Sequence, residues 1–286
     1  MRTGRNSHNA WQPAYRNGHS PVRILSLGAG VQSSTVAMMM RQGEIPNADH
    51  AIFADTGDEP RAVYDYLDYL RPLLPMPLHV VAKGRLSDDF LAALDDPRGR
   101  CGQPPFMVWN HEKQLGGRLW RKCTKEYKLD PIRRKVRELR EGRRVEQIIG
   151  ISLDEAMRMK PSGVKYITNV YPLVDLRMTR ADCLQWMERN GYRMPPKSAC
   201  VFCPYIANDR LRDMRDNAPK DWSALVEFDH EMRRRQRATV NGARITGTLY
   251  VHRDCKPIDE VDLRTAADFG QRDMFEDGCV EGICGV

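Results

Sequence analysis

The sequence contains no apolar run long enough to cross a membrane, which as a helix needs about 20 predominantly apolar residues. Its first twenty residues lack the apolar core of a signal peptide and are rich in arginine and asparagine, so we expect a flexible polar arm over residues 1–21. It also has no internal repeat and no low-complexity segment. These absences exclude a helical membrane protein and a repeat solenoid, and they favour a cytoplasmic protein with no membrane partner.

What is present fits a soluble globular chain of 286 residues, with 41% hydrophobic and 29% charged residues. The net charge of +7 comes mostly from arginine. It permits a nucleic acid or a polyanionic small molecule as partner, although a solvated surface would account for it equally well. Eight cysteines in a cytosolic chain are more typical of metal binding or catalysis than of disulfides, or they have no special role.

Short apolar strands alternate with helical patterns in the first part of the chain. Strands are expected at 22–27, 50–54, 78–82 and 145–151, with apolar residues spaced by three and four between them. This alternation predicts an α/β fold, a doubly wound parallel sheet, over residues 22–175. We expect a mostly helical, cysteine-bearing C-terminal extension over residues 176–286.

Two other stretches stand out between the strands. Residues 96–124 are predicted to be a long irregular loop, and such a loop inside a compact domain usually has a function. A helix with many arginines is expected over residues 131–139. Its charges indicate a solvated face, with phosphate contact as the alternative.

A glycine-rich turn, Gly28-Ala29-Gly30-Val31-Gln32-Ser33-Ser34, connects the first strand to the first helix. Such a turn directs backbone N–H groups, serine hydroxyls and the positive end of a helix dipole at one spot, which suits a phosphate. In a doubly wound sheet, ligands bind at the carboxyl ends of the strands, where this turn lies. An ordinary strand-to-helix connection is the simpler interpretation.

Cysteine pairs point to a second kind of chemistry. Cys200-Val201-Phe202-Cys203 followed by proline holds two thiols a few residues apart, as a tetrahedral metal or an iron–sulfur cluster requires. A [4Fe–4S] cluster is the preferred interpretation, and its remaining ligands would come from Cys123, Cys279 and Cys284. A zinc site, or a set of unligated thiols or a redox dithiol, is the alternative.

Four ordered segments resemble the PP-loop ATP pyrophosphatase superfamily, most of all its phosphoadenosine phosphosulfate reductase-like branch, which includes the sulfur-inserting enzymes of DNA phosphorothioation. They are the stretch from Ser26 to Ser34, the Phe53–Glu59 segment, the Arg121–Lys128 segment with Pro131-Ile132, and Gly150-Ile151 with Asp154-Glu155 and Arg158. The resemblance covers about residues 22–205. It implies an adenine nucleotide alpha hydrolase-like fold and binding of ATP, or of a nucleotide of the adenosine phosphosulfate type.

The resemblance also implies roles for individual residues. Residues at or beside the nucleotide would be Ser26, Gly28, Ala29, Gly30, Gln32, Ser33, Ser34, Asp55, Thr56 and Gly150. Cations that offset charge on the phosphates or on the second substrate would be Arg121, Lys125, Lys128 and Arg158. The catalytic candidates are Asp55, Cys123 and Cys284.

Two positions depart from the family pattern. Gly28 stands where the family usually has serine, and Gln32 stands where it usually has aspartate. An amide can donate a hydrogen bond to a phosphate, but it lacks the negative charge that holds Mg²⁺. Asp55, Asp58 or Glu59 would have to supply that carboxylate. Nucleotide binding is therefore a safer prediction than nucleotide cleavage.

Three functions follow from these observations. The first is an ATP-dependent sulfurtransferase that adenylates an oxygen of a tRNA, DNA or nucleotide and replaces it with sulfur from a donor such as a cysteine desulfurase. The second is a reductase of adenylylated sulfate, which would use a thiol reductant and release sulfite. The third is a non-catalytic module that binds a nucleotide or a nucleic acid.

Overall fold

The computed structural model describes residues 20–96, 98–235, 239–240, 243–244, 247–265 and 268. Nearly all of the predicted N-terminal arm, together with Cys279 and Cys284, lies outside these residues. Within them, every helix is too short or too polar to span a bilayer.

The central element is a parallel five-stranded sheet in the order β3-β2-β1-β6-β7. Its strands are β1 (Val22–Ser26), β2 (His50–Asp55), β3 (Leu78–Ala82), β6 (Val145–Ile149) and β7 (Ile167–Val170). The chain builds outward from β1 on one side and then crosses to β6 on the other. The predicted doubly wound sheet is confirmed, and the order reverses between β1 and β6, where such sheets bind ligands.

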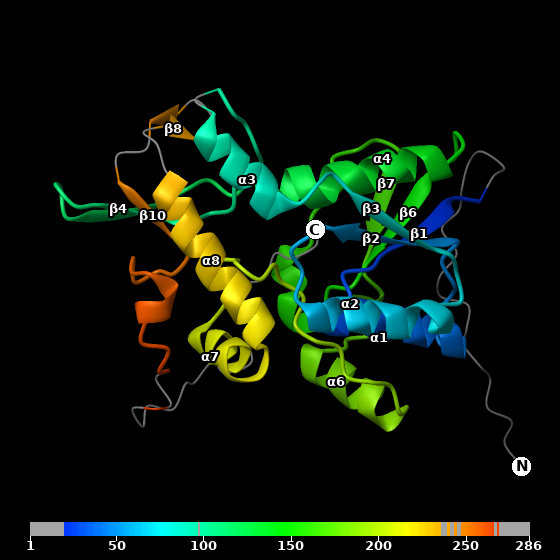
Figure 1. The fold of residues 1–286 in the computed structure, drawn as a ribbon. Helices are drawn as coiled ribbons and strands as arrows, with labels where there is room; N and C mark the ends of the chain where they lie inside the picture. Colours follow the sequence, from blue (N-terminus) through cyan, green and yellow to red (C-terminus); the bar gives the residue numbers. More distant parts are fainter. Residues whose placement is uncertain are drawn as a thin grey trace, which may run out of the picture.

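Helices cover both faces of this sheet (Figure 1). Helices α1 (Val31–Gln42), α2 (Arg61–Leu70) and α6 (Arg180–Arg189), with the short α5 (Pro172–Asp175), pack on one face around buried Leu25, Phe53 and Ile148. Helix α4 (Asp130–Leu139) packs on the other face.

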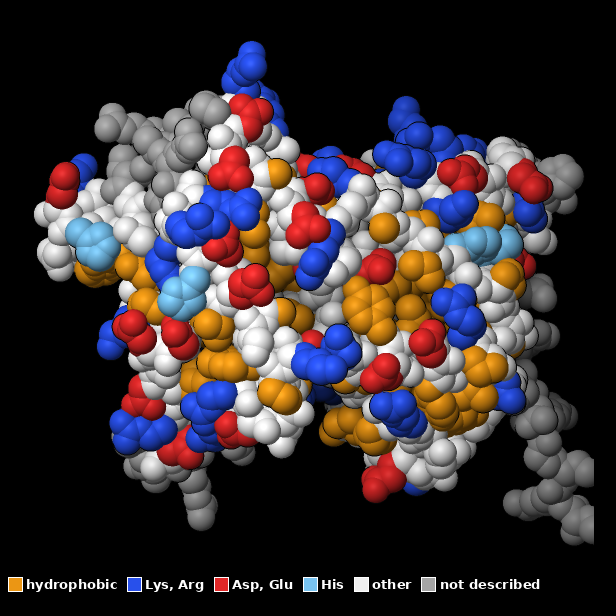
Figure 2. All heavy atoms as spheres, in the orientation of Figure 1, with side chains coloured by type: hydrophobic (Ala, Val, Ile, Leu, Met, Phe, Trp, Pro, Cys, Tyr) orange, Lys and Arg blue, Asp and Glu red, His pale blue; other side chains and the backbone are white. Residues whose placement is uncertain are grey.

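The arginine-rich helix predicted at 131–139 is α4. It buries Ile132 and Val136 against the strands and leaves Arg134 and Arg137 exposed. Figure 2 shows Lys and Arg side chains gathered over this helix with acidic side chains between them. This is how a helix with one apolar stripe separates its charges from the core.

A second core lies beside the sheet and joins distant segments. It includes α3 (Leu86–Asp95), α7 (Asn208–Asn217), α8 (Pro219–Arg235) and an antiparallel sheet in the order β10-β4-β5. The strands of that sheet are β4 (Met107–Asn110), β5 (Leu115–Arg118) and β10 (Thr248–Tyr250). At its centre the rings of Phe202 and Phe228 stack with centroids 4.2 Å apart, and Phe106 packs against both.

The short elements complete the described part of the chain. They are a two-stranded hairpin of β8 (Thr239–Val240) and β9 (Ala243–Arg244), the 3₁₀ turns Arg71–Leu73, Leu153–Arg158 and Ile258–Glu260, and a π-helical turn at Thr124–Leu129.

The stretch at 96–124 differs from the predicted irregular loop because it contains the β4–β5 hairpin. Gly116 and Gly117 form half of β5. Because glycine is depleted in strands, the sequence pattern does not predict a strand here. Its partner β10 comes well over a hundred residues later in the chain. Pairing across that distance cannot be recognised from local periodicity.

Gly150, which directly follows β6, offers a test of how the sheet holds the glycine-rich turn. A Cβ at this position would lie 2.6 Å from the backbone nitrogen of Ser33 and 2.8 Å from its Cα. We expect Gly150→Ala to lower the free energy of unfolding by about 1–3 kcal/mol, since backbone must shift to make room. The midpoint and slope of urea unfolding measure this loss.

Gly117→Ala is the matched control, because no atom lies within 4 Å of its added Cβ. Its effect should stay within about 0.5 kcal/mol. Equal shifts in the two variants would show that the contact between Gly150 and Ser33 does not constrain the turn.

Candidate functional site

The turn between β1 and α1 has a defined shape that its own residues maintain. Ala29 adopts a left-handed conformation with φ 54°, and Gly30 is the N-cap of α1. The hydroxyl of Ser33 accepts a hydrogen bond from the Gly28 N–H at 3.1 Å and donates one to the Gly30 carbonyl at 3.3 Å. The first N–H groups of α1 have no partners within the helix. The turn therefore presents donors to a ligand, as a phosphate site requires.

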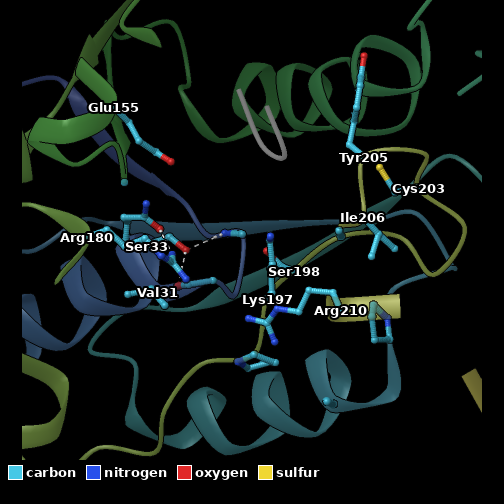
Figure 3. A pocket seen from close by; sticks show the side chains of 18 of the residues that line it. Val31, Ser33, Glu155, Arg180, Lys197, Ser198, Cys203, Tyr205, Ile206 and Arg210 are labelled. Atoms are coloured by element: carbon cyan, nitrogen blue, oxygen red, sulfur yellow. Dashed lines mark hydrogen bonds between the residues drawn. The ribbon is translucent and has the colours of Figure 1, made fainter. Parts of the chain in front are cut away.

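A cavity of about 530 Å³ opens over this turn. Its size lies within the range of small-molecule sites. One side is formed by the ends of β1 and β6, with Ser26, Gly28, Gly30, Gln32 and Ser33 from the turn and Gly150 and Arg158 from the other half of the sheet. The other side is formed by residues 196–199, the Cys203–Ile206 segment and α7. Figure 3 shows Ser198 and Lys197 between Ser33 and Arg210.

Four cationic side chains line the cavity: Arg158, Arg180, Lys197 and Arg210. The acidic residues that line it are Glu155, Asp209, Asp213 and Asp221. Arg158 Nη1 donates to Glu155 at 2.7 Å, while its Nε is buried and has no hydrogen-bond partner among the described residues. A buried donor without a partner is costly unless a ligand or water satisfies it.

Gln32 is held at both ends of its amide. Its Nε2 donates to Ser152 Oγ at 3.4 Å, and its Oε1 accepts from Arg180 Nη1 at 3.3 Å. The amide thus holds the guanidinium beside the glycine-rich turn without neutralising it.

A second, smaller cavity of about 30 Å³ adjoins the first. Its lining includes the thiols of Cys123, Cys200 and Cys203 together with Thr56, Arg121 and Lys128. Cys203 lines both cavities. Cys203 therefore lies between the two cavities, with the glycine-rich turn in one and the other two thiols in the second.

Burial dominates the electrostatics of these thiols. It raises the pKa of Cys200 well above the ordinary value, and the nearby Glu59 carboxylate adds to the increase. The Thr56 hydroxyl lies 3.2 Å from the Cys200 sulfur. Burial also raises the pKa of Cys123, and Arg121 partly offsets that increase. Both thiols are therefore held in the protonated form at neutral pH.

The described residues do not complete a metal site. Across the chain that the structure describes, no three His, Cys, Asp or Glu side chains are arranged to hold a metal ion. Cys279 and Cys284 lie outside this part. The [4Fe–4S] cluster, and zinc as its alternative, therefore remain predictions that depend on those two cysteines.

Several predicted residues lie away from both cavities. Ala29 and Ser34 are fully buried beneath the turn. The carboxylate of Asp55 accepts hydrogen bonds from the Gly57 N–H and the Tyr64 hydroxyl, both at 2.8 Å. Lys125 is exposed and pairs with Asp130 at 2.8 Å.

Part of the site was not predicted from the sequence. Arg180, Lys197, Ser198, Tyr205 and Arg210 all line the large cavity. Lys197 and Ser198 come just before the Cys200–Cys203 pair, and that position was the only local signal for them. Nothing in the sequence pattern marks Arg180, because its place beside Gln32 arises from the packing of α6 on α1.

No protein-family model matches the sequence, and no curated protein matches it. Among solved structures, the chain is similar to the crystal structure of phosphoadenylyl-sulfate (PAPS) reductase from Candida auris in its phosphate complex. That likeness has a TM-score of 0.41 and 16% sequence identity, and it covers 63% of this chain and 82% of that chain. At this level it carries no information on activity.

The burial of the thiols predicts an order of reactivity toward iodoacetamide. In protein treated with a chelator at pH 8, we expect Cys203 to be modified at least tenfold faster than Cys200. Cys203 faces the large cavity, whereas Cys200 has a strongly raised pKa, and alkylation needs an accessible thiolate. Peptide mass spectrometry over time measures both rates.

Cys183, which is fully buried in the core with a pKa raised to about 12, is the internal unreactive reference. Modification of Cys200 before Cys203 would contradict this geometry.

Proposed function

We propose that this chain is an ATP-dependent sulfurtransferase that activates an oxygen of a nucleic acid or nucleotide and replaces it with sulfur. The observation that carries the proposal is Cys203, which lines the phosphate-turn cavity and the thiol cavity at once. Sulfur transfer after adenylation needs a phosphate site and a sulfur-carrying group within reach of the same atom.

The phosphate site would bind the β- and γ-phosphates of ATP through the first N–H groups of α1 and the surrounding cations. The acceptor oxygen then attacks the α-phosphorus, and pyrophosphate leaves. Arg158, Arg180 and Lys197 line the cavity and would offset the charge that grows on the leaving group. The orphaned Nε of Arg158 gains a partner in this arrangement.

The thiol side would complete the reaction, with Cys200 and Cys203 acting as a redox dithiol and not as ligands of a cluster. A persulfide on Cys203, loaded by a sulfane-sulfur donor such as a cysteine desulfurase, attacks the adenylated centre through its terminal sulfur and displaces AMP. The acceptor is then joined to Cys203 by a disulfide. Cys200 or Cys123, which line the same small cavity, loses its proton and attacks the Cys203 sulfur, and the thiolated acceptor leaves and takes up that proton. An external thiol reduces the resulting protein disulfide.

The surface beside the cavity supports a nucleic acid as acceptor. The guanidinium carbons of Arg118 and Arg121 lie over the ring of Tyr205, 5.4 and 5.5 Å from its centroid, and Tyr205 lines the large cavity. Between these arginines in sequence, Trp120 is 84% exposed. An exposed aromatic ring flanked by cations is how proteins bind unpaired bases and their phosphates.

The function predicts pyrophosphate release from ATP that requires an added nucleic acid or nucleotide. We expect Cys203→Ser to retain this release and to lose incorporation of sulfur into the acceptor, since the serine leaves the phosphate site intact. Radiolabelled ATP and ³⁵S incorporation measure the two steps. Cys255→Ser is the control, because Cys255 lines neither cavity. Sulfite release from adenylylated sulfate, with no pyrophosphate from ATP, would instead identify a reductase.

Trp120 gives a separate test of the acceptor surface. Loss of one base stack costs about 1–3 kcal/mol, so we expect Trp120→Ala to weaken binding of a single-stranded oligonucleotide by roughly 5- to 150-fold. Trp120→Phe keeps an aromatic face and should retain most of the affinity. Fluorescence anisotropy of a labelled strand at fixed salt measures both. Equal affinity of the alanine variant and the unsubstituted protein would remove this surface from the proposal.

A further inference from the structure

Gln32, within the glycine-rich turn, carries a neutral amide whose oxygen and nitrogen are both hydrogen-bonded. Its oxygen accepts from Arg180 Nη1 at 3.3 Å and its nitrogen donates to Ser152 Oγ at 3.4 Å. A carboxylate here would pair with Arg180 and cancel its charge. With glutamine, the guanidinium keeps its full positive charge beside the turn.

The carboxylates expected to hold Mg²⁺ lie outside the large cavity. Asp58 accepts from the Ser87 N–H at 2.8 Å, the Ser87 hydroxyl at 2.7 Å and Arg85 Nε at 3.0 Å. Glu59 Oε1 pairs with Lys128 at 3.2 Å, and its Oε2 is buried without a hydrogen-bond partner among the described residues. Neither of these residues, nor Asp55, lines the large cavity.

The acidic residues that do line the cavity are bonded to other groups or lie across the cavity from the turn. Glu155 is paired with Arg158 at 2.7 Å. Asp209 and Asp213 belong to α7 on the other side of the cavity, and Asp221 Oδ2 accepts from the Arg61 N–H. Mg²⁺ prefers carboxylate oxygens with room for its waters. The residues around the turn do not fit it.

Arg180 is positioned firmly enough to act in place of a metal ion. It is the first residue of α6, whose N-terminus is closed by a capping box between Thr179 and Asp182. Its backbone N–H donates to Asp154 Oδ1 at 3.0 Å, so the main chain is anchored as well as the side chain. A guanidinium fixed in this way binds phosphate oxygens by charge-assisted hydrogen bonds.

We infer that the phosphate turn binds its nucleotide without a divalent cation, and that Arg180, held by Gln32, supplies the charge that Mg²⁺ would supply. This inference rests on the proposed nucleotide site. It assigns Arg180 as a binding residue and Gln32 as the residue that positions it.

Isothermal titration with inorganic pyrophosphate tests the inference, in buffer with EDTA and in buffer with Mg²⁺. For the unsubstituted protein we expect affinities in the two buffers within about threefold of each other. Arg180→Gln should lose about tenfold or more in both, because a charge-assisted hydrogen bond is lost. Arg180→Lys keeps the charge and should recover part of the affinity. Arg189→Gln, on the exposed end of the same helix, is the matched control and should bind as the unsubstituted protein does.

Gln32→Glu tests the positioning role with a side chain of the same length. The carboxylate should pair with Arg180 and weaken pyrophosphate binding in EDTA by about tenfold, with part of the loss restored by Mg²⁺. Thermal unfolding of each variant confirms that the fold is kept.

The outcomes separate the two proposals. Binding by the unsubstituted protein only when Mg²⁺ is present would overturn the inference and leave the nucleotide site standing. Equal binding by Arg180→Gln and Arg189→Gln would overturn it too. Absence of pyrophosphate and ATP binding in both buffers would overturn the proposed function together with the inference.

Discussion

The site depends on close contact between the two halves of the sheet at the point where strand order reverses. Ser26 of β1 is paired with Ile149 of β6, and the next residue, Gly150, lies directly against the backbone of Gln32 and Ser33. Only a residue without a Cβ allows this approach. It brings the start of α1 beside the segment that carries Ser152 and Arg158. This contact therefore places Arg158 on the same cavity as the glycine-rich turn.

Much of this framework could be predicted because the signals are local. Apolar strands buried on both faces, followed by helices with a three- and four-residue period, gave the parallel sheet and the position of the turn at a strand end. What failed was the pairing of β4 with β10 and the placement of Arg180 beside Gln32, 148 residues away. Both arise from tertiary packing, in which the identity of a residue says little about which distant residue it will meet.

Burial explains why the thiols are enclosed and protonated whereas the neighbouring glycine-rich turn exposes polar groups to a cavity. The turn exposes main-chain donors to a cavity that is large and lined by charge. The thiol cavity has room for about one water molecule, and its enclosure raises the pKa of Cys200 and Cys123. In such surroundings a thiol stays protonated until a nearby cation or a metal stabilises the thiolate. Arg121 and Lys128 line that cavity and lower the pKa of these thiols, but the effect of burial is larger and the pKa of each stays raised.

One segment of the chain contributes residues to both cavities. Residues 195–205 run from α6 toward α7 and contribute Lys197 and Ser198 to the phosphate cavity and Cys200 and Cys203 to the thiol cavity. The Val201 N–H donates to the Asp58 carbonyl at 2.8 Å, and a Cβ added at Gly30 would lie 3.1 Å from the Ser198 hydroxyl. Only a few residues separate Lys197 from Cys203, so one short length of backbone, anchored on Asp58, places side chains in both cavities.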